Sequence, residues 1–132
     1  MKTILKFACI CSLALSAPNT SFADKILGTW LSPPDKKGQT GHVMVTHCGD
    51  AFCGRLVRTY DKNGAPITTK NTGLQIFWGM KEISAEAYRG GHVYVPIMGK
   101  TFAAKLDVKG ANLHVRGCVG PVCKKQVWTR VR

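Results

Sequence analysis

Short stretches of β-branched and aromatic residues recur at intervals of about ten residues, separated by Gly, Pro, Asn and Asp. This spacing is typical of short strands joined by tight turns. Apolar and polar side chains alternate within the stretches, as in a sheet with one face on a core and the other in water. We therefore predict eight strands, at Ile26–Leu31, His42–His47, Gly54–Tyr60, Leu74–Met80, Val93–Pro96, Thr101–Val108, Asn112–Gly117 and Gln126–Val131.

The fold that this pattern favours is all-β. Only Met80–Tyr88 has the composition of a helix. About eight short strands with almost no helix predict a small antiparallel up-and-down β-barrel, with a compact sandwich as the alternative. A barrel has the advantage of leaving no open sheet edge. Two sets of residues are expected to share a face: Leu74, Ile76, Trp78 and Met80, and Phe102, Ala104, Leu106 and Val108.

The N-terminus has the pattern of a secretory signal. Lys2 and Lys6 precede an apolar run over Phe7–Ala17, and small residues end the segment at Ala23. The run is too short to cross a bilayer. We predict a signal peptide over residues 1–23, a single β-barrel domain over residues 24–132, and a periplasmic or secreted location.

Four cysteines follow the predicted signal, as two pairs with the same spacing: Cys48 with Cys53, and Cys118 with Cys123. Each pair straddles a predicted hairpin turn, and disulfides persist in oxidising compartments. We favour bridges 48–53 and 118–123 over the other two connectivities. A zinc site made by all four thiolates is the alternative.

The charge of the chain and the motifs that it contains limit the partners and reactions that we expect. The chain has 19 Lys and Arg against 7 Asp and Glu, but no nucleic-acid-binding motif, so an anionic envelope component is a better partner than nucleic acid. His42, His47, His92 and His114 are scattered, and Glu82 and Glu86 are the only close carboxylate pair. We therefore expect no enzyme activity, no bound metal and no cofactor. We also expect that the protein is not an integral membrane protein.

Several separated motifs resemble those of a known family. They are Gly28-Thr29-Trp30, Cys48–Leu56, Gly91–Phe102, Leu113–Cys118 and Trp128–Arg130. Together they resemble the DUF2147 family of small exported bacterial proteins, over nearly the whole of residues 24–132. The family usually has an Asp where Val95 stands. The resemblance implies a lipocalin-like barrel and no settled biochemical activity.

The resemblance also implies how the barrel is closed at one end. Lipocalin-like barrels place a Trp from an early Gly-x-Trp motif against an Arg from the last strand. Gly28, Trp30 and Arg130 match that arrangement, and a guanidinium on an indole face contributes roughly 0.5–2 kcal/mol.

The leading functional hypothesis is a barrel that binds a small apolar or amphipathic molecule in its mouth. An anionic group on that molecule is a further feature of the hypothesis. Arg58 and Arg116 are candidates to meet an acidic group. The alternative is an envelope interaction protein with a filled barrel and a basic outer surface. The residues expected to line the ligand site are Leu74, Ile76, Trp78, Tyr94 and Phe102.

Overall fold

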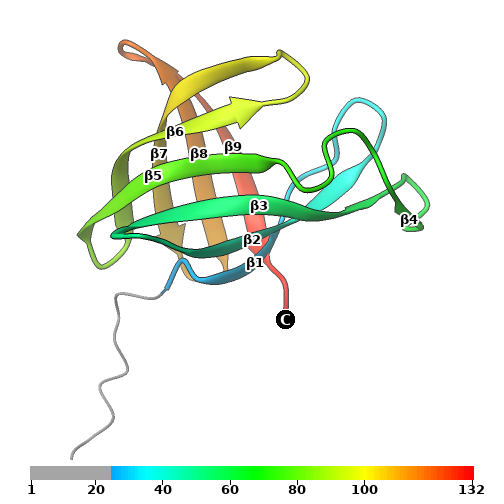
Figure 1. Cartoon of the computed structure of the whole chain (residues 1–132), viewed down its shortest axis with the longest axis horizontal. Helices are drawn as coiled ribbons and strands as arrows, with labels where there is room; N and C mark the ends of the chain where they lie inside the picture. The colour runs from blue at the N-terminus through cyan, green and yellow to red at the C-terminus, as the bar shows by residue number, and fades with distance from the viewer. Residues whose placement is uncertain (1–24) are drawn as a thin grey trace, which may run out of the picture.

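The computed structural model describes residues 25–132, which form nine strands in one antiparallel sheet (Figure 1). The predicted signal peptide over residues 1–23 lies outside the described residues. The strands are β1 (Gly28–Leu31), β2 (Thr40–Cys48), β3 (Ala51–Tyr60), β4 (Pro66–Ile67), β5 (Gln75–Ser84), β6 (Ala87–Val95), β7 (Lys100–Lys109), β8 (Asn112–Val119) and β9 (Val122–Arg130).

The sheet closes on itself. Its strand order is β2-β1-β9-β8-β7-β6-β5-β3, and β2 also pairs with β3, so each of these eight strands has a neighbour on both sides. Strand β4 stands apart and pairs with the end of β3 alone. The predicted antiparallel barrel of eight strands is confirmed, and the sandwich alternative is wrong, because β2–β3 pairing leaves no second sheet.

The two ends of the barrel differ. One end, which we call the closed end, holds the β2–β3, β5–β6 and β7–β8 hairpins. Large buried side chains fill it. The other end holds the remaining connections and we call it the mouth. On β7 the predicted face is confirmed, because Ala104, Leu106 and Val108 are buried. The closed end is filled by Ile26, Trp30, Phe52, Met80, Tyr88, Leu106 and Leu113.

Strand β5 does not alternate as predicted. Its register against β3 shifts twice, so that Gly54 faces Phe77 while Phe52 faces Met80. Ile76 and Phe77 are both buried as a result, although they are consecutive. Gly79 takes up the second shift with a φ of +66°, a conformation that side chains with a Cβ rarely adopt. Leu74, Ile76, Trp78 and Met80 therefore do not share a face.

The predicted helical segment Met80–Tyr88 is also wrong. It forms the ends of β5 and β6 and the turn between them, with Glu82 opposite Tyr88. Met80 and Tyr88 are fully buried and lie on different strands. Their burial in the barrel outweighs the weak helical propensity of the residues between them.

The cysteines pair within hairpins. Cys118 lies directly opposite Cys123, with the two Cα atoms 4.1 Å apart. Cys48 and Cys53 are diagonal neighbours, because Cys48 faces Ala51, and their Cα atoms are 5.8 Å apart. Disulfides 48–53 and 118–123 are confirmed. The zinc alternative does not fit, because one pair lies at the closed end and the other at the mouth.

Candidate functional site

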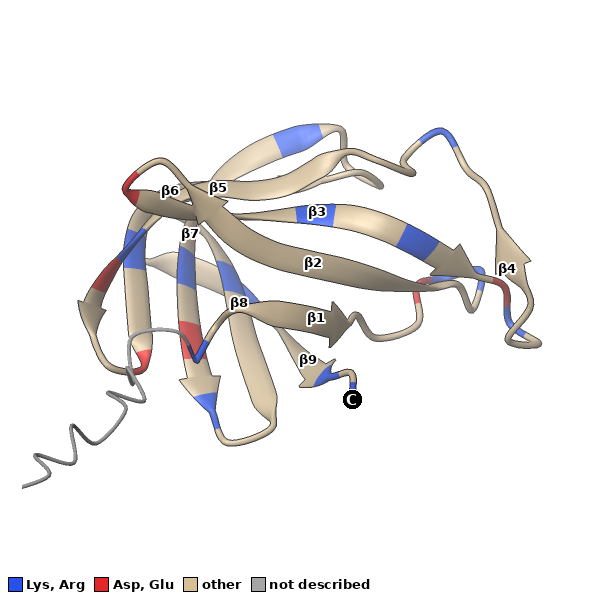
Figure 2. Cartoon of the chain, turned by 60° about the horizontal axis from the view of Figure 1, so that its bottom comes forward, with Lys and Arg blue, Asp and Glu red and all other residues tan. Residues whose placement is uncertain are grey.

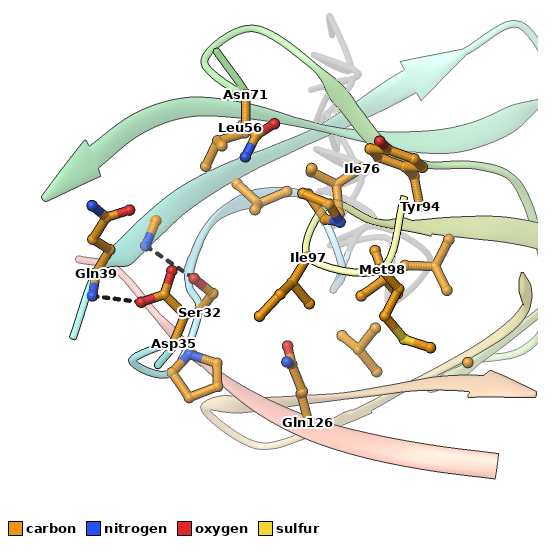
Figure 3. A pocket seen from close by; sticks show the side chains of 18 of the residues that line it. Ser32, Asp35, Gln39, Leu56, Asn71, Ile76, Tyr94, Ile97, Met98 and Gln126 are labelled. Carbon is orange, nitrogen blue, oxygen red and sulfur yellow. Dashed lines mark hydrogen bonds between the residues drawn. The ribbon is translucent and has the colours of Figure 1, made fainter. Parts of the chain in front are cut away.

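The mouth of the barrel opens into a cavity of about 740 Å³. Ligand sites of small molecules commonly enclose about 300–1,000 Å³. Figure 3 shows Leu56 and Ile76 among the side chains around this space. Its wall is largely apolar, and is made by inward-facing side chains from seven of the eight barrel strands: Val43, Leu56, Ile76, Val93, Phe102, Val115 and Trp128.

The lining of the cavity includes a few polar groups. Trp128 is buried, and its indole Nε1 donates a hydrogen bond of 3.0 Å to Oε1 of Gln126, whose side chain is exposed within the lining. Thr59 also lines the cavity and is 6% exposed, yet its hydroxyl has no hydrogen-bond partner. A few polar groups in an apolar wall are what orients a bound molecule.

The rim of the mouth is basic. Lys36, Lys37, Lys70 and Lys124, which we call the rim lysines, all line the opening. Of the described residues that line it, only Asp35 carries a carboxylate, and its Oδ1 accepts hydrogen bonds from the backbone N–H groups of Lys37 (2.8 Å) and Gln39 (2.9 Å). Asp35 thus holds the β1–β2 loop in shape, while the ammonium groups give the mouth a net positive charge.

Three of the predicted lining residues border the cavity. Ile76 and Phe102 belong to the wall, and Tyr94 stands at the rim (Figure 3). Leu74 and Trp78 are not among the lining residues. Leu74 precedes β5 and is 36% exposed. Trp78 follows the inward-facing Phe77, so it points out of the barrel and stacks on His92, with ring centroids 6.1 Å apart.

The two predicted arginines also lie outside the cavity. Arg58 follows a register shift in the β2–β3 pairing and lies opposite His42 on the outer surface. Burial and the nearby Arg58 guanidinium lower the pKa of His42. Arg116 faces outward on β8 and binds Asp107. Neither guanidinium reaches a molecule in the mouth.

Sequence reasoning missed the rim lysines and the inner face of β9. Val122, Lys124, Gln126 and Trp128 alternate along β9, and all four line the cavity. The alternation itself was visible, but Lys and Gln on one face indicate the solvent side of a sheet. An open mouth is wet, so polar side chains are allowed on the inner face there.

At the closed end, Trp30 and Arg130 are paired across β1 and β9. The Arg130 guanidinium carbon lies 4.1 Å from the centroid of the Trp30 ring, and its nitrogens donate to the carbonyls of Leu27 and Lys25. Burial, and then the charge of Arg132, lower the pKa of Arg130. A Cβ on Gly28 would come within 3.1 Å of the guanidinium. This is the arrangement that the family resemblance implies for Gly28, Trp30 and Arg130.

An ion-pair cluster lies on the outer surface of β6, β7 and β8. Asp107 accepts hydrogen bonds from Arg89 (3.0 Å) and Arg116 (2.8 Å), one on each carboxylate oxygen. Burial by itself would raise the pKa of Asp107, but the hydrogen bonds and charges of the two arginines outweigh it and lower the pKa. Arg89 also donates to the carbonyls of Tyr88 and Leu106, which ties β6 to β7.

Replacing Asp107 with Asn is expected to lower the free energy of unfolding by about 1 kcal/mol at pH 7. The folded state favours the ionised carboxylate, so its contribution is complete above the usual pKa of 3.8 and is lost as the pH falls through the lower pKa of the folded protein. Urea unfolding of both proteins from pH 7 to pH 2 measures this difference. A difference that stays constant below pH 3 would contradict this account.

Residues 25–132 contain no group of three or more His, Cys, Asp or Glu side chains arranged to hold a metal ion. They also contain no helix with the length and apolar character needed to span a bilayer. Figure 2 shows the Lys and Arg residues spread over the barrel strands and loops, and fewer acidic positions.

Comparison with known proteins supports the resemblance found in the sequence. Residues 28–130 match the model of a family described as "Uncharacterized protein conserved in bacteria (DUF2147)". A solved structure of Protein HP1028 from Helicobacter pylori, whose title places it in the lipocalin family, has a TM-score of 0.61. It shares 15% identity, and the match covers 80% of this chain and 82% of that one. The likeness supports the fold alone. No curated protein matches the chain.

Proposed function

Because the chain belongs to the DUF2147 family, which has a lipocalin-like barrel here but a description that names no activity, we propose a function from the geometry of the mouth. The barrel binds a small amphipathic molecule, with its apolar part in the cavity and an anionic group at the rim lysines. The observation that carries this proposal is an apolar cavity of about 740 Å³ with a basic rim.

The wall and the rim of the cavity would bind different parts of one ligand. The inward side chains bury apolar surface, which contributes roughly 25 cal/mol per Å² removed from water. The rim lysines attract an anion, because their four ammonium groups outnumber the single carboxylate, that of Asp35, among the described lining residues. The exposed amide of Gln126 offers hydrogen bonds to a polar group of the ligand.

Binding without catalysis is part of the proposal. Among the described lining residues Asp35 is the only carboxylate, and it is occupied by the loop that it stabilises. A general acid or base must lie within hydrogen-bond reach of the proton that it transfers, and the Asp35 carboxylate already accepts two backbone N–H groups of its own loop. The alternative of a filled barrel requires side chains in the space that the cavity occupies, so it has less support.

We also propose that the protein works outside the cytoplasm, in the periplasm or after secretion. The disulfides 48–53 and 118–123 support this location, because such bonds persist in oxidising compartments. Mass spectrometry of the protein recovered from cells tests the predicted signal peptide. A chain that begins at Asp24 supports export, and a chain that begins at Met1 contradicts it.

The binding test uses the fluorescent anion 1-anilinonaphthalene-8-sulfonate as the probe. We expect its emission to rise on binding, and dodecanoate to displace it at least tenfold more effectively than dodecan-1-ol, a difference of about 1.4 kcal/mol that the rim lysines supply. Equal displacement by the acid and the alcohol would contradict the proposal that the ligand carries an anionic group. If neither compound displaced the probe, the proposal that the cavity binds an amphipathic ligand would be wrong.

A matched pair of variants locates the probe. Gln126→Trp places a large ring in the cavity, whereas Val127→Trp adds the same ring at the next residue of β9, which is 39% exposed and absent from the lining. We expect Gln126→Trp to weaken binding of the probe more than tenfold and Val127→Trp to leave it within about twofold. Equal binding by the two variants would show that the probe sits elsewhere.

A further inference from the structure

Exposed apolar side chains gather around the mouth. Ile97 and Met98, in the β6–β7 loop, are 68% and 50% exposed, and Val119 and Val122, at the tip of the β8–β9 hairpin, are 67% and 69% exposed. All four also border the cavity, and we call them the mouth collar. Figure 1 shows both connections at the top of the molecule, and Figure 3 shows Ile97 and Met98 beside the cavity.

The collar is not explained by the packing of the barrel. Apolar side chains at two separate connections are exposed to water beside a largely apolar cavity. Contiguous exposed apolar surface on a protein usually marks an interaction site. The rim lysines surround the same opening, so the surface that carries the collar is both apolar and positively charged.

We propose that the mouth collar docks on the surface of an anionic phospholipid bilayer, so that an amphipathic ligand passes between the bilayer and the cavity without crossing water. The inference rests on the proposed function for the nature of the ligand. Apolar side chains that enter the headgroup region, flanked by lysines that meet anionic lipid, are the general requirements for binding at a membrane surface.

Charge complementarity favours a bilayer over a neutral apolar partner. The four rim lysines line the same opening as the collar, and Asp35 is the one acid among the described lining residues. An anionic leaflet attracts basic side chains over roughly a Debye length, about 8 Å at physiological salt. The apolar tips would then come within reach of the acyl region.

The experiment is co-sedimentation with vesicles of phosphatidylcholine alone and of phosphatidylcholine mixed with an equal amount of phosphatidylglycerol. It uses the protein as cells produce it, so every variant carries the same N-terminus. We expect binding to the anionic vesicles to be at least tenfold stronger than to the neutral ones, and to weaken in 0.5 M salt. Equal binding to both kinds of vesicle, or binding to neither, would overturn the proposal.

The double variant Ile97→Ser/Val122→Ser tests the collar, and Ile83→Ser/Val127→Ser is its matched control. Ile83 and Val127 are 64% and 39% exposed and lie outside the mouth, Ile83 near the closed-end turn of β5. We expect the collar variant to lose at least tenfold in vesicle binding and the control to change by less than about twofold. An equal loss in both would overturn the proposal.

A separate readout distinguishes this inference from the proposed function. Displacement of the fluorescent probe by dodecanoate in solution is measured for the collar variant and for the unmodified protein, because Ile97 and Val122 also border the cavity. A loss of vesicle binding at least tenfold larger than the loss of displacement supports the collar as a docking surface, and equal losses of both would overturn it. If the unmodified protein bound vesicles but dodecanoate did not displace the probe, the docking surface would be supported and the proposed ligand binding would be wrong. Binding to a soluble polyanion such as heparin but to neither kind of vesicle would overturn the docking surface.

Discussion

Replacing Trp30 with alanine is expected to lower the free energy of unfolding by about 3–5 kcal/mol, the usual cost of removing a large buried aromatic side chain. Trp30 is fully buried at the closed end, and its Nε1 donates a hydrogen bond of 2.8 Å to the carbonyl of Ile26. Its loss would leave a cavity, an unpaired carbonyl, and a guanidinium of Arg130 without its aromatic neighbour. Urea unfolding followed by circular dichroism measures the change.

Trp78→Ala is the matched control for this prediction. Trp78 lies on the outer surface of the barrel, where it stacks on His92 of the neighbouring strand β6. Its removal opens no cavity in the core, and we expect a cost of about 1 kcal/mol, the contribution of an aromatic pair. A similar loss for both tryptophans would show that Trp30 does not close the barrel in the way described.

Replacing Gly91 with alanine is expected to cost about 3 kcal/mol or more, at the upper end of the range for overpacking. A Cβ at this position would lie 2.1 Å from the carbonyl oxygen of Trp78 and 2.7 Å from the carbonyl carbon of Gly79. Both atoms belong to the backbone of β5, so no side-chain rotation relieves the clash. The strands must separate where β5 is already bulged.

Gly117→Ala makes the same change on β8 and serves as the control. Its Cβ would meet Val93 Cγ1 at 3.3 Å and Phe102 Cβ at 3.4 Å, which are side-chain atoms beside an open cavity. Neither Gly91 nor Gly117 has a positive φ, so the two substitutions differ in their neighbours and not in backbone strain. We expect Gly117→Ala to cost less than about 1 kcal/mol. Thermal unfolding that shifts equally in both variants would contradict the role given to Gly91.

The local features of the fold could be predicted because they depend on neighbours in sequence. Turn residues such as Lys109-Gly110 mark where strands end, and period-two burial on β7 indicates which side chains face the core. The cysteine pairs were within reach for the same reason, since each spans a single hairpin. The pairing of Trp30 with Arg130 was predicted from a family resemblance instead, because these two residues lie far apart in the chain.

The ligand site was predicted only in part, and β5 shows why. A bulge inserts one residue into a strand and turns every later side chain to the other face. Because bulges depend on the partner strand, the sequence of β5 alone assigned Trp78 to the interior, whereas its pairing with β3 and β6 places the ring outside. The same kind of shift between β2 and β3 moved Arg58 out of the mouth.

The all-β class, the eight barrel strands, the turns and the favoured pairing of the cysteines all follow from the printed sequence, because hydrophobic period and turn chemistry act over a few residues. The tertiary structure alone decided that one end of the barrel is filled and the other open, and that lysines from three separate segments meet at the opening. Those properties depend on how the strands are staggered around the barrel, and stagger is set by long-range pairing and bulges that no short stretch of sequence encodes.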